Sequence, residues 1–114
     1  MGNLGVAYRS IGQSQLAVEC GQRQLEIARE TADRQAEGVA LANLGSARAS
    51  LGKPHSAIED FQQALQVFRA VGDRGGEGGA LGSLGLAYVF LGEAHKALGY
   101  LKAALRILKE TGDQ

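Results

Sequence analysis

Residues 80–92 read ALGSLGLAYVFLG, and forty positions earlier residues 40–52 read ALANLGSARASLG. An Ala-Leu pair, two Leu-Gly pairs and an alanine coincide in these two copies. A third copy comes into register after another shift of forty residues, because Leu4-Gly5 then aligns with Leu44-Gly45 and Leu84-Gly85. Self-similarity at a fixed period of roughly 20–50 residues is typical of repeat proteins. The sequence therefore predicts three copies of one structural unit.

Each repeated unit divides into two helices. Apolar residues recur at helical spacing from Arg34 to Leu51 and again from Arg74 to Leu91, which predicts a first helix in each unit. Second helices are expected at about 54–71 and 94–111. We therefore expect an all-α chain with six helices in three antiparallel hairpins. The whole chain, 1–114, is read as one array with units at about 1–32, 33–72 and 73–114.

Glycine, proline and acidic residues mark the predicted helix ends. A glycine after a helix can adopt the left-handed conformation that ends it, and proline is tolerated in the first helical turn. An aspartate before a helix accepts a hydrogen bond from a free backbone N–H, and glutamate in the first turn favours the positive end of the helix. The residues expected in these roles are Gly12, Gly52, Gly72, Gly92, Gly112, Pro54, Asp33, Asp73, Glu37 and Glu77.

Two positions depart from the repeated pattern. Gly21 stands where the other units have Phe61 and Leu101, so we expect looser packing in the first unit. Arg48 stands where the other units have tyrosine. We expect the stem of Arg48 to pack against the helix and its guanidinium to reach outward.

The repeated residues resemble a known family. The pattern L-G-x-A-Y at 84–88, with A-x-x-x-F-x-x-A-L at 57–65, is similar to the tetratricopeptide repeat. The forty-residue period and the Gly-Asp-Arg-x-x-Glu-Gly linker resemble its long-helix subclass, which includes Leu-Gly-Asn repeat adaptors, kinesin light chains and arrays in bacterial regulators. The resemblance implies a right-handed α-solenoid with first helices along its concave face.

The distribution of charge points to a binding surface. Residues 78–92 carry no charge, and residues 38–52 carry only Arg48. A helix without charge on either side is normally covered on both, so we expect a groove that receives an extended or helical peptide. The chain is thus expected to be a protein-binding scaffold. By the register of the resemblance, its candidate groove residues are Asn3, Val6, Arg9, Asn43, Ser46, Ser50, Ser83, Leu86, Val89 and Phe90.

An alternative reading assigns the same surface to self-association. The chain begins inside a first helix and ends without a helix to cover the last unit. It could therefore be a fragment of a longer array, with its groove covered by a swapped or missing helix, or a homodimer through its uncapped ends.

The glycine-rich stretch 75–85, GGEGGALGSLG, is not expected to bind phosphate. It lacks the Lys-Ser or Lys-Thr of a Walker loop, and no predicted strand precedes it. In register it matches the start of the preceding unit's first helix, so it predicts a glycine-diluted helix. Gly79 and Gly82 are expected to face the groove.

Composition excludes several other functions. The net charge is zero and the pI is about 6.7, so neither nucleic acid nor an anionic membrane is expected as a partner. A single cysteine, Cys20, and the lack of a secretion signal favour a cytoplasmic location. His55 and His95 lie one unit apart, too far for a shared metal ion without other ligands. No enzyme activity, metal or cofactor is expected.

Overall fold

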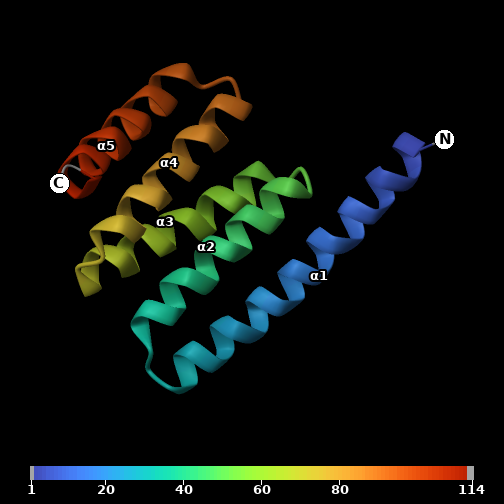
Figure 1. Cartoon of the computed structure of the whole chain (residues 1–114), viewed down its shortest axis with the longest axis horizontal. Coiled ribbons are helices and arrows are strands. Elements are labelled where there is room, and N and C mark those ends of the chain that lie inside the picture. Colours follow the sequence, from blue (N-terminus) through green and yellow to red (C-terminus); the bar gives the residue numbers. More distant parts are fainter. Residues whose placement is uncertain (1, 113–114) are drawn as a thin grey trace.

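Five consecutive α-helices make up the part of the chain that the computed structural model describes, which is the backbone of residues 2–112 and the side chains of residues 12–112. Neighbouring helices run antiparallel and stack in chain order (Figure 1). No strand occurs within this described part. The helices are α1 (Gly2–Glu30), α2 (Arg34–Ser50), α3 (Pro54–Val71), α4 (Arg74–Phe90) and α5 (Ala94–Gly112).

The ends of α2 to α5 confirm the sequence-based boundaries to within about one residue. Asp33 accepts a hydrogen bond from the backbone N–H of Ala36 at 3.1 Å, and Asp73 accepts one from Gly76 at 2.9 Å. Pro54 occupies the first turn of α3. Left-handed backbone, with a φ of 76° in each case, follows three of the helices at Gly52, Gly72 and Gly92.

The prediction of three complete hairpins is wrong in the first unit. Gly12 does not form a turn, because α1 runs without interruption through it. In the other units a large side chain of the second helix packs over a glycine of the first. Phe61 covers Gly45 in this way. The equivalent second-helix residue in the first unit is Gly21, where an added Cβ would lie 2.9 Å from the side chain of Leu44 on α2. Gly21 therefore lets α2 approach α1 closely and has no side chain of its own to pack on a folded-back helix.

The core lies between α2, α3, α4 and α5. Leu44 and Leu84, the leucines of the repeated Leu-Gly pairs, are the largest fully buried side chains. Each following glycine allows close approach, since a Cβ added to Gly45 or Gly85 would lie only 2.6 Å from its neighbour's side chain. The repeated Leu-Gly pair thus supplies both the filling side chain and the gap for the next helix.

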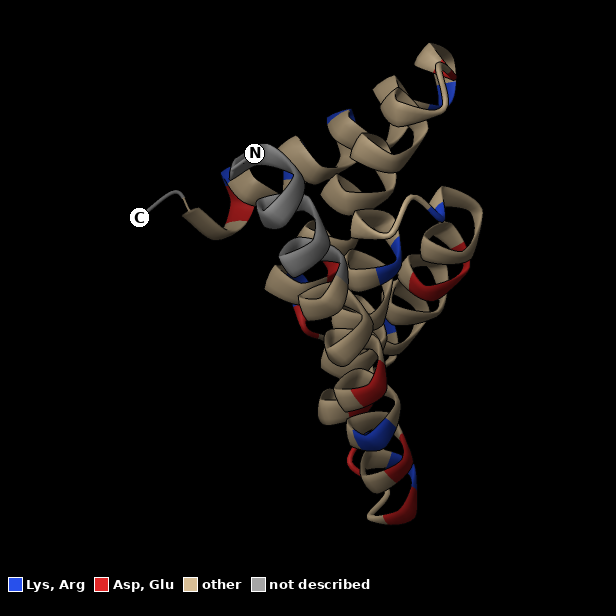
Figure 2. Ribbon diagram, turned by 90° about the vertical axis from the view of Figure 1, so that its right-hand side faces the viewer, with Lys and Arg blue, Asp and Glu red and all other residues tan. Residues whose placement is uncertain are grey.

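Ion pairs link successive hairpins at their turns. Glu77 on α4 accepts hydrogen bonds from Arg69 of α3 and Arg74 of its own helix, both at 3.0 Å. These arginines hold the pKa of Glu77 below its ordinary value, with the hydrogen bond from Arg69 the largest cause. The first two units repeat this arrangement around Glu37. Figure 2 shows charged residues crowded at the lower end of the molecule, where α1 turns into α2.

Candidate partner-binding cleft

A cavity of about 370 Å³ lies between α2 and α4, with part of α3 at its floor. We call it the α2–α4 cleft. The two helices are the first helices of consecutive units, so the forty-residue register places equivalent faces side by side. The residues that define the cleft are Ser46 and Ser50 of α2, Phe61 of α3, and Ser83, Leu86 and Phe90 of α4.

One wall of the cleft is apolar and open to solvent. Phe90 is 79% exposed and Leu86 is 65% exposed, although both are large hydrophobic residues. Val89, which is 55% exposed, lies beside them in sequence but does not line the cavity. Contiguous exposed apolar residues on a folded protein commonly mark an interaction site.

The opposite wall of the cleft is polar but uncharged. Ser46 and Ser50 are exposed on α2, and Ser83, which is half-buried on α4, adds a third hydroxyl next to the apolar wall. Hydroxyl groups can both donate and accept hydrogen bonds, so these serines suit the backbone of a peptide. No residue that lines the cleft carries a formal charge. The cleft therefore suits a neutral ligand with an apolar side chain.

The structure brings together half of the sequence-predicted groove residues. Ser46, Ser50, Ser83, Leu86 and Phe90 line the one cleft. Asn43 is exposed on α2 and lines a separate cavity, between α1 and α2, together with Ser46 and Ser50. The side chains of Asn3, Val6 and Arg9 lie outside the described residues.

Comparison with known proteins supplies the family. Residues 1–70 and residues 37–110 each match the family model for the tetratricopeptide repeat. The chain belongs to the tetratricopeptide repeat family. The tetratricopeptide repeat domain of Arabidopsis FLU, known from a crystal structure, superposes with a TM-score of 0.72 at 19% sequence identity. That match covers 91% of this chain and 95% of the FLU domain, which supports the fold. No curated protein gives a significant match.

Tetratricopeptide repeat domains generally mediate protein–protein interactions and generally lack catalytic activity, so membership supports an interaction role. Within the described residues, no group of three or more His, Cys, Asp or Glu side chains could hold a metal ion. His55, His95 and Cys20 are all exposed. No helix in the described part is both long and apolar enough to cross a bilayer.

Arg48 corrects one expectation about this tetratricopeptide surface. Its guanidinium does not reach outward. Instead it donates hydrogen bonds to both carboxylate oxygens of Asp60 on α3, at 2.8 and 2.9 Å. Asp60 is buried, and burial raises its pKa despite the nearby Arg48 charge. The repeat alignment could have indicated this pair, because Arg48 and Asp60 align with Tyr88 and Tyr100.

Proposed function

We propose that this tetratricopeptide array is a scaffold module that binds a short, neutral segment of a partner protein in the α2–α4 cleft. The observation that carries the proposal is the exposure of Leu86 and Phe90 beside a cavity whose lining has no charge. Burial of each such side chain by a partner contributes about 1.5–3 kcal/mol. The two together are enough to anchor a peptide of modest affinity.

The shape and chemistry of the cleft define the partner segment. One aliphatic or aromatic side chain fits the cavity of about 370 Å³, against Leu86 and Phe90. The hydroxyls of Ser46 and Ser50 then lie beside the backbone or a polar flank of the ligand. Gly79 lies further along the same face of α4, and an added Cβ there would meet nothing within 4 Å. A partner backbone can therefore approach α4 closely at this point, in an extended or helical conformation.

A peptide-display library selected against the whole chain provides a test of this function. The dissociation constant of each selected peptide is measured for the wild type, for Leu86→Asp and for Phe90→Asp. Since a buried carboxylate faces an apolar ligand group in both variants, we expect at least roughly tenfold weaker binding. Both residues are exposed, so circular dichroism should show unchanged helix content.

The control for this test is Leu98→Asp. Leu98 lies on α5, is 53% exposed and lines none of the cavities described above. The same chemical change there should leave peptide affinity within about twofold of the wild type. Binding that ignores both α4 variants, or that is lost in Leu98→Asp, would place the ligand elsewhere and contradict the proposal.

A further inference from the structure

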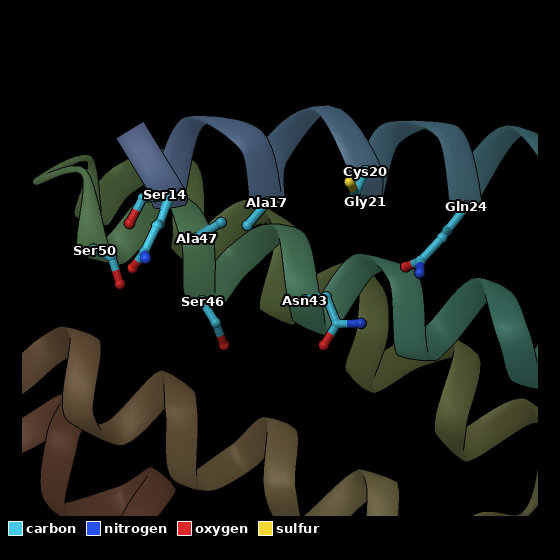
Figure 3. Close-up of a pocket in the computed structure, with 10 residues that line it drawn as sticks. Ser14, Ala17, Cys20, Gly21, Gln24, Asn43, Ser46, Ala47 and Ser50 are labelled. Atoms are coloured by element: carbon cyan, nitrogen blue, oxygen red, sulfur yellow. The ribbon is translucent and has the colours of Figure 1, made fainter. Parts of the chain in front are cut away.

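A second and larger cavity, of about 590 Å³, lies between α1 and α2. We call it the α1–α2 slot. Figure 3 shows Ser14, Ala17 and Gln24 of α1 pointing toward α2. The lining residues that matter for the argument are Ala17, Cys20, Gly21 and Gln24 of α1, and Asn43 and Ala47 of α2.

In the third unit, the place that corresponds to the α1–α2 slot is occupied by the first helix of that unit, α4. The rings of Tyr88 on α4 and Tyr100 on α5 stack with their centroids 5.4 Å apart and an interplanar angle of 4°. A Cβ added to Gly85 of α4 would lie 2.6 Å from the side chain of Leu101 on α5. Tyr100 and Leu101 are therefore the positions of the second helix against which the first helix packs.

The α1 side of the slot consists of the same positions in the first unit. In the forty-residue register, Cys20 aligns with Tyr100, and Gly21 aligns with Leu101. Ala17 and Gln24 lie about one turn to either side on the same face, and all four residues line the slot. The slot therefore corresponds to the position that the first helix occupies in the third unit, and α1 does not fill this position itself.

The sequence at the start of the chain resembles the first helix that fills this position in the third unit. Residues 4–8 read LGVAY, and residues 84–88 of α4 read LGLAY. However, α1 is one continuous helix from Gly2 to Glu30, so residues 2–11 extend the axis of the residues that line the slot. They cannot fold back to cover their own slot without breaking the helix. A second copy of the chain can supply such a helix without any break in α1.

We propose that two copies of the chain exchange residues 2–11, so that each segment fills the α1–α2 slot of the other copy. Position 88 faces position 100 in the third unit, so the exchange would place position 8 of one copy opposite Cys20 of the other. Ser14 is midway between these positions. The two α1 helices therefore pair antiparallel about a two-fold axis near Ser14, which makes the interface isologous.

The α1–α2 slot and the α2–α4 cleft meet on α2. Ser46, Ala49 and Ser50 of α2 face α4 across the α2–α4 cleft. The exchange goes beyond the proposed peptide binding, because the slot shares Ser46 and Ser50 with the α2–α4 cleft but not its apolar residues Leu86 and Phe90.

Gly12 is the hinge of this arrangement. Its equivalents, Gly52 and Gly92, adopt left-handed turns, whereas Gly12 lies inside α1. A Cβ added at Gly12 would meet nothing within 4 Å, so Gly12→Ala favours the continuous helix without a clash. Ser14→Pro has the opposite effect, because proline disfavours helical backbone at the preceding residue and removes an N–H donor. It also reproduces the Pro54 of the second unit.

Sedimentation over a concentration series tests the exchange. We expect the mass of two chains for the wild type and for Gly12→Ala, with Gly12→Ala dimeric to lower concentration. Ser14→Pro should have the mass of one chain, because its first helix closes onto its own slot. A wild type with the mass of one chain at every concentration would overturn the proposal. A dimer that persists in a folded Ser14→Pro variant would do the same.

Thiol cross-linking keeps the proposal testable if Ser14→Pro fails to fold. The variant Tyr8→Cys, which retains the native Cys20, is treated with a short bifunctional maleimide. We expect a covalent dimer that is lost in the control Tyr8→Cys/Cys20→Ser. A tether between the two thiols of one chain would show a closed hairpin and overturn the exchange, as would the absence of any cross-link.

Discussion

Arg48 on α2 donates hydrogen bonds to both carboxylate oxygens of Asp60 on α3. In the next unit the same two positions hold Tyr88 and Tyr100, whose rings stack with an interplanar angle of 4°. One place in the hairpin is thus filled by an ion pair in one repeat and by an aromatic pair in another. What the repeat conserves at this place is a contact between two side chains and not a residue type.

Replacing the ion pair by an aromatic pair tests whether the two pairs are equivalent. Asp60→Ala leaves the half-buried Arg48 without its partner, so we expect a loss of about 1–3 kcal/mol in the free energy of unfolding. The double variant Arg48→Tyr/Asp60→Tyr reproduces the aromatic pair and should recover most of that loss. Urea unfolding of the variants measures both effects. A double variant less stable than Asp60→Ala would show that the two sites are not interchangeable.

Two glycines of α4 should respond in opposite ways to alanine. Gly79→Ala should stabilise the protein by about 0.5–1 kcal/mol, because alanine favours a helix. Its added Cβ would meet nothing within 4 Å. Gly85→Ala should destabilise it by about 1–3 kcal/mol through overpacking. Its Cβ would lie 2.6 Å from the side chain of Leu101. Urea unfolding compares the pair, and a stabilised Gly85→Ala variant would contradict the close approach of α4 and α5.

Glu77 should contribute to acid sensitivity. Its folded pKa lies below its ordinary value of 4.5, chiefly because Arg69 donates a hydrogen bond to it. A depressed pKa gives stability that is present above the ordinary value and is lost as the pH falls through the folded value. The stability advantage of the wild type over Glu77→Gln should therefore shrink between about pH 6 and about pH 3. An advantage that stays constant over this range in urea unfolding would rule out the effect.

Asp60 provides a comparison of opposite sign. Burial raises its folded pKa above 3.8. A raised pKa gives stability that is present below the ordinary value and is lost as the pH rises through the folded value. The wild type should therefore gain stability relative to Asp60→Asn on acidification. The same titration in urea measures this, and a change in the direction of Glu77→Gln would contradict the buried carboxyl.

Helix ends were predictable from the sequence because their causes are local. Asp33 and Asp73 act as N-caps through their own side chains, and the left-handed glycines need no tertiary contact. The turn at Gly12 was predicted by the same local signal and was wrong. Gly12 differs from Gly52 in its surroundings, because Ser14 stands in place of Pro54 and Gly21 in place of the large side chain of Phe61. A repeat pattern alone does not weigh these two losses.

The cleft was predictable in part for a similar reason. The register of the family resemblance places Leu86 and Phe90 on the groove face of α4, and both side chains are exposed in the structure. Periodicity does not specify which neighbour a face meets. Asn43 therefore lines the α1–α2 slot and not the cleft with Leu86. Register within one helix could be derived from the sequence, whereas pairing across helices required the packed structure.

The central claim is that a partner segment lies between α2 and α4. Its most direct test replaces Phe90 with the photoreactive analogue p-benzoylphenylalanine and irradiates the protein with a display-selected peptide. A matched protein carries the analogue at Leu98 on α5. We predict a cross-link to the peptide from position 90 and none from position 98. A cross-link from position 98 alone would contradict the assignment of the cleft.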